Sequence, residues 1–321
     1  MTKPYVSIHG NRLGLSGNGL LRVDGKDFKG DVPTLGKDIF VDSVTGADTS
    51  DGLTPDSALA TLDAAFGQTT ANKGYRIFIL PNHSETITGA AGIAHDVAGV
   101  SVFGLGHGGQ RPTFLMDGAT TVTYKITAND AHVSNLVFNS GHADVVTCID
   151  VQIATDAWID GCEFGDNTTA ENFLTCIKSG TATDNQCDGL KVTNCVWRSI
   201  DAASLEFIEI TGNLDRLTVL DNVVNTAGTG LACLVNVTAG DSVFTADIGR
   251  NKLINKDAAD GITLFITDQS DNTGFAYQNF LACLDVLGEL VATATSGLFF
   301  YENRTASVGG TTGYLLPGAD S

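Results

Sequence analysis

Apolar and polar residues alternate with a period of two along most of the 321-residue chain. Short runs rich in β-branched and aromatic residues, such as LKVTNCVW and LTVLDNVV, are separated by turn-forming clusters such as GDNTTAEN and NTAGTG. Such alternation is typical of strands with one buried face, and clusters of Gly, Asn and Asp are typical of turns. No long stretch after Phe66 has helical periodicity. The pattern therefore predicts an all-β protein built from short strands.

Similar segments recur along the chain with a period of about 28 residues, and a fixed period of this size is typical of repeat architectures. The period is too short for a propeller blade of about 40 residues, and the spaced leucines of a leucine-rich repeat are missing. A parallel β-helix with about three short strands per coil accommodates it. Gly104 extends the series by one period toward the N-terminus. The central residues of the segments are Asn135, Gly161, Asn194, Asn222, Asn251 and Asn279.

Equivalent residues of successive coils would lie about 4.8 Å apart, the spacing of strands in any sheet. Asparagines at one inward corner could therefore donate their amides to one another and to turn carbonyls. The apolar residues around Asn222 and Asn251 lie one position away from those of the earlier repeats, which indicates a bulge or a changed corner. We predict a structural ladder of Asn135, Asn194, Asn222, Asn251 and Asn279.

The cysteines recur with the same period. Cys148 and Cys176 are one period apart, Cys233 follows after about two further periods, and Cys162 and Cys195 occupy like positions in neighbouring repeats. No C-x₂-C pair is present, so the cysteines are interpreted as packing residues rather than metal ligands. An odd number of cysteines, seven, does not fit a secreted disulfide framework. Large aromatic residues recur in the same way, at Phe138, Phe164 and Trp197.

The opening segment from Val41 to Phe66 differs from the repeats. Thr54 followed by Pro55 is a helix-start signal, and the apolar residues after it share one helical face. The ends of a β-helix expose unpaired strand edges, which need a cover. We expect a short capping helix over the first coil, with RIFIL at 76–80 as the first buried strand. The apolar residues of the helix are Leu59, Leu62, Ala65 and Phe66.

The segment FVDSVTGADTSDGLTPDSALATLDAAF resembles the opening of many proteins of the pectate-lyase-like superfamily of right-handed β-helices. The shared features are an aromatic-Val-Asp start, a G-x-D turn, a D-G-x-x-P step and a small capping helix. The likeness extends from about Asp38 to Tyr301 and implies a right-handed parallel β-helix. Because this superfamily includes polysaccharide lyases and hydrolases as well as phage tailspikes and other virion proteins, the fold alone does not indicate an activity.

The chain is strongly acidic. Its 18 Lys and Arg residues against 37 Asp and Glu residues give a net charge of −19, which disfavours binding to nucleic acid. The N-terminus lacks the apolar segment of a secretory signal, and no apolar run is long enough to span a membrane. We expect synthesis in a reducing cytoplasm, with no signal peptide, no membrane insertion and no nucleic-acid partner.

Two short motifs are similar to catalytic motifs of the superfamily. Gly106-His107-Gly108 resembles the Gly-His-Gly of polygalacturonase-type hydrolases, but neither Asn-Thr-Asp nor Asp-Asp follows it. The sequence WID at 158–160 resembles part of a pectate-lyase motif, but Gly161 stands where that motif has His. We interpret the first motif as a turn and the second as an ordinary strand.

Acid–base or calcium chemistry would need carboxylates that converge. Asp42, Asp48 and Asp51 miss the spacing of a calcium-binding loop, and we expect them to form Asx turns instead. We predict no metal site and no cofactor. Successive coils could still bring together carboxylates for a polysaccharide hydrolase or lyase, and the candidates are Asp150, Asp160, Glu163 and Glu209.

Residues 1–36 differ from the rest in charge and composition. They carry five basic and three acidic residues, a net charge of +2, so the remainder carries −19 − 2 = −21. Their apolar residues are too few for a core but could add strands to a sheet of another protein. The alternative is an arm that folds back on its own β-helix. The residues expected to contact a partner are Tyr5, Ile8, Arg12, Leu20, Leu21, Arg22, Lys26 and Lys29.

We divide the chain into an extended anchoring arm (1–36), an opening turn with a capping helix (37–75), the parallel β-helix (76–303) and a C-terminal tail or cap (304–321). The arm, the resemblance and the missing catalytic motifs favour a non-enzymatic structural protein of a bacteriophage. It would be a capsid decoration, a head fibre, or a tail spike or fibre. We expect a homotrimer on the virion surface, made in the host cytoplasm and anchored to capsid or tail proteins.

Two alternatives remain open. A polysaccharide-degrading lyase or hydrolase, similar to a tailspike, requires a groove of exposed aromatic residues and a close pair of carboxylates. A non-catalytic module that binds a host-surface glycan requires the exposed aromatic residues without that pair.

Overall fold

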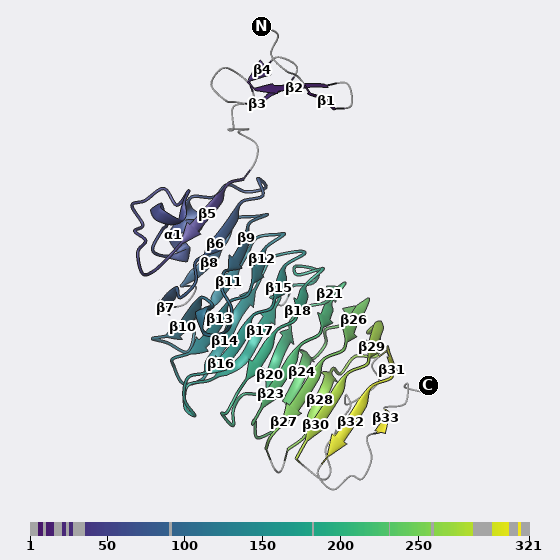
Figure 1. Cartoon of the computed structure of the whole chain (residues 1–321). Helices are drawn as coiled ribbons and strands as arrows, with labels where there is room; N and C mark the ends of the chain where they lie inside the picture. Colours follow the sequence, from purple (N-terminus) through teal and green to yellow (C-terminus); the bar gives the residue numbers. More distant parts are fainter. Residues whose placement is uncertain are drawn as a thin grey trace. The chain divides into compact units, whose positions relative to one another are not determined.

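The computed structural model describes residues 36–89, 92–181, 183–230, 232–257, 260–284 and 297–307, together with short strands within 1–35 and at 314–315. The chain divides into two compact units, residues 1–36 and 37–321. Figure 1 shows the second unit as a stack of coils that runs from β5 to β31 and β32. Within the described residues, no helix is long and apolar enough to cross a membrane.

The first unit contains short strands that pair with one another in sequence order. Neighbouring strands run antiparallel, with Leu13 opposite Val6 on one side and Val23 on the other. The region expected to be an extended arm therefore contains a small antiparallel sheet, because short alternating runs only a few residues apart pair locally. The strands are β1 (Val6–Ile8), β2 (Asn11–Leu15), β3 (Leu21–Val23) and β4 (Lys26–Asp27).

Most of the residues expected to contact a partner lie on these strands. Ile8 is in β1, Arg12 in β2, Leu21 and Arg22 in β3, and Lys26 in β4. Tyr5, Leu20 and Lys29 lie outside the described residues.

The second unit is a parallel β-solenoid, as the repeats predict. In the described part of this unit, strands from successive coils pair in parallel to form three long sheets. Sheet 1 comprises β5 (Asp38–Val41), β6 (Arg76–Ile79), β9 (Ser101–Gly104), β12 (His132–Ser134), β15 (Trp158–Asp160), β18 (Lys191–Thr193), β22 (Thr218–Leu220), β26 (Ala246–Gly249), β29 (Gly274–Tyr277) and β31 (Leu298–Tyr301).

Sheet 2 comprises β7 (Ser84–Thr88), β10 (Thr113–Asp117), β13 (Val137–Ser140), β16 (Glu163–Asp166), β19 (Val196–Arg198), β23 (Val223–Thr226), β27 (Lys252–Asn255), β30 (Phe280–Cys283) and β32 (Arg304–Ser307), with β33 (Tyr314–Leu315) antiparallel at its edge. Sheet 3 comprises β8 (Ile93–His95), β11 (Tyr124–Ile126), β14 (Val145–Val151), β17 (Phe173–Ser179), β20 (Glu206–Ile210), β24 (Ala232–Val237) and β28 (Ile262–Ile266). The strands β21 (Leu214–Asp215) and β25 (Val243–Phe244) pair separately.

Inward-facing residues of the coils form the core. In sheet 2, Phe138 and Phe164 stack at 5.7 Å between ring centroids, and the register continues to Trp197. The predicted recurrence of large aromatic residues is thus confirmed. Because equivalent residues lie one strand spacing apart, like side chains pack on like side chains along the whole solenoid.

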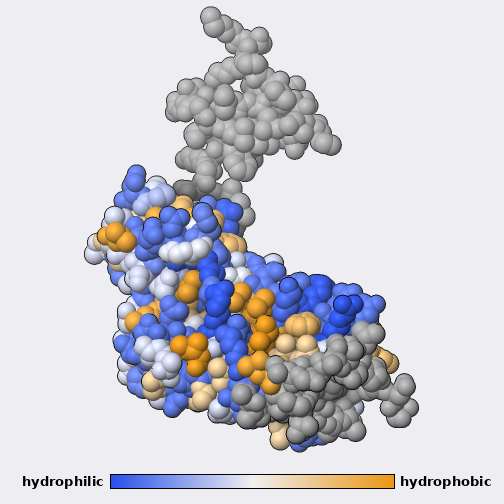
Figure 2. Space-filling model, turned by 60° about the horizontal axis from the view of Figure 1, so that its bottom comes forward, coloured by the Kyte–Doolittle hydropathy of each residue, from blue (hydrophilic) through white to orange (hydrophobic). Residues whose placement is uncertain are grey.

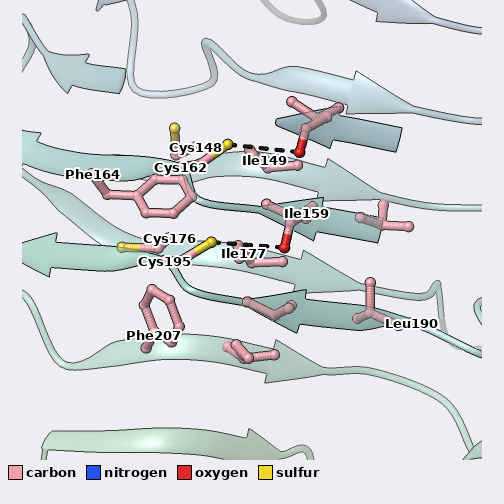
Figure 3. Packing of buried hydrophobic residues seen from close by; sticks show 14 of the residues in the cluster. Cys148, Ile149, Ile159, Cys162, Phe164, Cys176, Ile177, Leu190, Cys195 and Phe207 are labelled. Carbon is pink, nitrogen blue, oxygen red and sulfur yellow. Dashed lines mark hydrogen bonds between the residues drawn. The ribbon is translucent and has the colours of Figure 1, made fainter. Parts of the chain in front are cut away.

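The cysteines are buried within this core. Figure 3 shows Cys148, Cys162, Cys176 and Cys195 beside buried aromatic rings. Burial raises the pKa of Cys148, Cys176 and Cys195 well above the usual range, so these thiols stay neutral. Cys233 is also buried. It does not lie in register with Cys148 and Cys176, because it pairs with Glu206, which in turn pairs with Thr175, the residue before Cys176.

The capping helix begins later than its start signal predicts. Thr54 precedes a single 3₁₀ turn, η1 (Pro55–Ser57), and the α-helix α1 (Leu62–Gly67) starts after Thr61, whose hydroxyl accepts a hydrogen bond from the Ala64 N–H at 3.3 Å. The chain is extended between the two because Leu59 forms a bridge to Val41 at the sheet edge. A second 3₁₀ turn, η2, spans Gly108–Gln110.

The first strand of the solenoid is β5, not RIFIL. Ile39 and Val41 of β5 are buried, and β5 pairs in register with β6, which contains the RIFI residues. Alternation in DIFV, immediately before the opening turn, is the signal for this strand.

The asparagine ladder in the structure differs from the predicted one. Asn135 and Asn194 are not part of it, since they occupy the corner position after sheet 1, where the chain adopts positive φ angles of 58° and 55°. Asn and Gly tolerate this left-handed conformation better than other residues. The buried position that follows is apolar in the earlier coils and becomes asparagine in the later ones, at Asn222, Asn251, Asn279 and Asn303.

Side-chain hydrogen bonds link these four asparagines. Nδ2 of Asn222 donates to Oδ1 of Asn251 at 3.0 Å, and Nδ2 of Asn251 donates to Oδ1 of Asn279 at 2.9 Å. Asn279 continues the ladder to Asn303, at 2.9 Å. From Asn135 onward the corner keeps one conformation, since Asp221, Arg250 and Gln278 adopt the same positive φ as Asn135 and Asn194. The phase shift in the sequence therefore reflects a changed residue at an unchanged corner.

Candidate functional site

The four candidate catalytic carboxylates lie on three different sheets. Asp150 and Glu209 are on sheet 3, Asp160 ends a strand of sheet 1, and Glu163 begins a strand of sheet 2. The register places Lys178 between Asp150 and Glu209, so these two carboxylates are two strands apart, about 10 Å along the solenoid. A retaining glycosidase needs its two carboxyl groups about 5 Å apart, and an inverting one needs about 6.5–9.5 Å with room for a water, whereas the Lys178 strand lies between Asp150 and Glu209. The coils do not bring the four residues together.

Asp150 and Glu209 belong to a ladder of alternating charge on sheet 3. Lys125, Asp150, Lys178 and Glu209 follow one another in register. Nζ of Lys178 lies 2.8 Å from Oε1 of Glu209. Burial raises the pKa of Asp150, and the hydrogen bond from Gln152 and the two lysines oppose that shift. Each charge has an opposite neighbour, which indicates a structural role.

Asp160 and Glu163 are also occupied by structural partners. Oδ1 of Asp160 accepts hydrogen bonds from Oγ1 of Thr193 at 2.6 Å and Nδ2 of Asn194 at 2.9 Å. Glu163 forms ion pairs with both Arg111 and Arg198. Two guanidinium groups hold the Glu163 carboxylate, which indicates a structural role.

Asp42 and Asp51 form the predicted Asx turns, whereas Asp48 accepts hydrogen bonds from backbone N–H groups 12 and 13 residues away. Oδ1 of Asp42 accepts from the Val44 N–H, Oδ1 of Asp51 from the Leu53 N–H, and Oδ1 of Asp48 from the Ala60 N–H. His107 lies in an exposed turn before η2. Within the described ranges, no group of three His, Cys, Asp or Glu residues is placed to hold a metal ion.

The outer face of sheet 1 carries exposed aromatic residues at its C-terminal end. Phe275 and Phe299 stack at 5.9 Å between ring centroids, and Tyr277 and Tyr301 stack at 5.2 Å with an interplanar angle of 7°. Phe275 is 53% exposed and Phe299 is 69% exposed. Figure 2 shows apolar residues gathered among hydrophilic ones on one face of the molecule. We call Phe275, Tyr277, Phe299 and Tyr301 the C-terminal aromatic surface.

A shallow pocket of about 490 Å³ adjoins this surface. Two glycines shape it. A Cβ on Gly274 would lie 2.1 Å from the Ala246 carbonyl oxygen, so only glycine allows the two backbones to approach this closely. A Cβ on Gly249 would lie 2.5 Å from the Tyr277 ring, which therefore lies flat over the preceding coil. The lining residues are Thr245, Ala246, Asp247, Thr273, Gly274, Phe275, Tyr277 and Tyr301.

The polar groups of the pocket centre on Tyr277. Burial and a hydrogen bond to Asp247 raise the pKa of Tyr277, while Arg250 lowers it. Nη1 of Arg250 donates to the Tyr277 hydroxyl at 3.2 Å, and its guanidinium lies 5.8 Å from the ring centroid. Arg250 also forms a bidentate ion pair with Asp221. These contacts fix the Tyr277 ring at the edge of the pocket.

The residues of the C-terminal aromatic surface were not among the sites predicted from the sequence. The signal was present, because GFAY and LFFY repeat the pattern of an aromatic residue two positions before a tyrosine, at 275 and 277 and at 299 and 301. Alternation places both residues of such a pair on one face of a strand.

Comparison with known proteins gives likeness in structure alone. No family model and no curated protein sequence matches the chain. A rhamnogalacturonan lyase matches with a TM-score of 0.41 and 11% identity, over 86% of this chain and 89% of that one. A GH136 lacto-N-biosidase from Eubacterium ramulus matches with a TM-score of 0.38 and 10% identity, over 84% of this chain and 68% of that one.

Proposed function

We propose that the solenoid is a non-enzymatic module that binds glycans on its C-terminal aromatic surface. The observation that carries the proposal is the row of stacked, exposed rings of Phe275, Phe299 and Tyr301 beside a pocket with polar groups. Aromatic faces present large apolar areas against which the C–H faces of a sugar ring can pack, and nearby hydroxyl and carboxylate groups can bind sugar hydroxyls.

The same surface argues against an enzyme acting at this place. Among the described residues that line the pocket, Asp247 is the only carboxylate. Hydrolysis by two carboxylates needs a second one on the opposite side of the scissile bond. The four candidate carboxylates lie in the ladder, ion pairs or hydrogen bonds described above, and none is among the lining residues.

We expect immobilised glycans to retain the purified chain, with Phe275→Ala and Tyr301→Ala each weakening binding about tenfold, since a stacked aromatic ring contributes about 1 kcal/mol beyond its buried area. Binding to a glycan array followed by titration of the best ligand measures this effect. Ile200→Ala is the matched control, because Ile200 is 52% exposed but lies outside sheet 1. Equal affinity of the three variants and the wild type would contradict the proposal. Release of reducing ends that Glu163→Gln or Glu209→Gln abolishes would instead support an enzyme.

We further propose that the first unit attaches the protein to a larger particle, a bacteriophage virion, with the solenoid at its surface as a homotrimer. The supporting observation is that residues 1–36 form a compact unit of their own, with a sheet that pairs separately from the solenoid. A small separate unit could bind the particle while the acidic solenoid remains exposed at its surface. The candidate contact residues are those named above for 1–36.

Cross-linking mass spectrometry on intact particles tests this attachment. We expect cross-links from Lys3, Lys26 or Lys29 to a capsid or tail protein, and cross-links between equivalent lysines of neighbouring copies. Lysines of the solenoid such as Lys125 and Lys191 serve as the internal comparison. Cross-links from the first unit that reach only its own solenoid would contradict the anchoring role.

A further inference from the structure

We propose that the pocket beside the C-terminal aromatic surface binds an organic ammonium group, such as the protonated amine of an amino sugar. This inference rests on the proposed glycan binding and names the chemical class of ligand that the same site prefers.

The aromatic rings are placed to hold a cation. Phe275 and Tyr301 meet edge to face, with ring centroids 6.4 Å apart and planes at 78°, and both line the pocket. Tyr277 lies parallel to Tyr301 on the same side of sheet 1. The faces of such rings carry negative charge density, and an ammonium group within about 6 Å of a ring centroid is attracted to it.

Asp247 adds a negative charge that the protein leaves unpaired. On the outer face of sheet 1, Asp38 is paired with Arg76 at 2.7 Å, and Asp160 accepts hydrogen bonds from two side chains. Among the described residues, Asp247 forms no ion pair, and it lies near enough to the Tyr277 hydroxyl to raise the pKa of that tyrosine. Asp247 beside the rings of Phe275 and Tyr301 combines a negative charge with the negative charge density of aromatic faces, and both attract an organic ammonium ion.

The charges around the pocket also exclude the opposite class of ligand. In the described part of the chain no lysine or arginine lines the pocket, and the nearby Arg250 is already paired with Asp221 at 2.7 Å. With a net charge of −19, the whole chain repels anions. A uronate or another acidic sugar would place its carboxylate against Asp247. The site therefore selects an ammonium-bearing ring over an anionic ring of the same shape. Its volume of about 490 Å³ is within the usual range of about 300–1,000 Å³ for small-molecule sites.

Calorimetric titration of the full chain with four small probes at pH 6 and low salt tests the inference. The probes are choline, glucosamine, N-acetylglucosamine and glucuronate. We expect choline and glucosamine to bind, N-acetylglucosamine to bind at least tenfold more weakly, and glucuronate not to bind. Asp247→Asn should weaken binding of choline and glucosamine about tenfold and leave N-acetylglucosamine unchanged. Asp56→Asn removes the same charge from exposed η1 at the other end of the solenoid and should have no effect.

The outcomes separate this inference from the glycan-binding proposal. If N-acetylglucosamine binds as tightly as glucosamine and Asp247→Asn changes neither, the ammonium preference is wrong while glycan binding stands. If neither the probes nor the glycan array bind, both proposals fail. Phe275→Ala provides a second variant that keeps the carboxylate, and it should weaken binding of choline and glucosamine as well. If Asp247→Asn and Phe275→Ala both bind choline as tightly as the wild type, choline binds at another site and the inference is wrong.

Discussion

Replacement of Asn251 by alanine is expected to lower the free energy of unfolding by about 4 kcal/mol, because it leaves several buried groups without partners at about 1–3 kcal/mol each. Nδ2 of Asn251 donates to the Val219 carbonyl at 2.9 Å, and its Oδ1 accepts from both the backbone and the side chain of Asn222 at 3.0 Å. All three partners lie inside the solenoid, where water does not replace the lost contacts. Urea unfolding of the variant and the wild type measures the loss.

Asn194→Ala is the matched control for this experiment. Asn194 is exposed, and its main constraint is the positive φ of 55° at the corner. Alanine in that conformation costs about 1–2 kcal/mol. Equal losses for the two variants would mean that the buried ladder contributes nothing beyond the corner geometry. A clearly larger loss for Asn251→Ala would support the ladder as the element that joins the later coils.

Acidification from pH 7 to pH 4 is expected to lower the stability of the solenoid by about 3 kcal/mol through His95 alone. Burial, the main cause, lowers the pKa of His95 to about 4, although its hydrogen bond to the Val100 carbonyl acts in the opposite direction. The unfolded chain has a His pKa of about 6.5, so it binds more protons than the folded protein between pH 6.5 and pH 4. The contribution of His95 to stability is therefore greatest above pH 6.5 and falls as the pH drops through this window.

The contacts of His95 fix it in the neutral form. Nε2 lies 3.1 Å from the Val100 carbonyl, which can only accept, so Nε2 carries the proton. Nδ1 then accepts from the Tyr124 hydroxyl at 3.1 Å. The ring also packs on Phe66 of the capping helix, with centroids 4.6 Å apart. Protonation would place a second N–H against the Tyr124 hydroxyl and a charge in the core that joins the cap to the first coils.

Urea unfolding of His95→Leu at pH 7 and pH 4.5 tests this assignment. The variant should be less stable at pH 7, because the Val100 carbonyl and the Tyr124 hydroxyl lose their partner. It should also lose the part of the pH dependence that His95 supplies, while the carboxylates contribute equally to both proteins. His107→Ala, at an exposed turn, should keep the wild-type pH dependence. Parallel pH profiles of His95→Leu and the wild type would show that another group senses the acid.

The repeat pattern predicted the architecture because the β-solenoid is a local and periodic fold. Alternation in runs such as LKVTNCVW specifies strands, and the constant period of the repeats specifies which residues of successive coils become neighbours. Phe138, Phe164 and Trp197 occupy one register for this reason. The predicted asparagine ladder and the predicted start of the capping helix differ from the structure by only one or a few residues. The corner and the ladder each accept asparagine, so spacing alone did not separate Asn194 from Asn222.

The candidate site was harder to predict, because it depends on which side chains from different coils become neighbours on the outer surface. The four candidate carboxylates come from neighbouring coils, but they lie on three different sheets. A corner separates Asp160 from Glu163, and Lys178 lies between Asp150 and Glu209. Tyr277 and Tyr301 belong to successive strands of sheet 1, and the fold brings their ring centroids to 5.2 Å from one another.

Strand alternation, coil length and the burial of thiols and aromatic rings follow from local sequence, since each depends on the residues of one coil and its period. The pocket beside Phe275, the unpaired carboxylate of Asp247 and the occupied carboxylates of Asp150 and Glu163 depend on side chains from different coils. Only the folded solenoid decides those contacts, because the lengths of the corners set which side chains share a face and which oppositely charged groups meet.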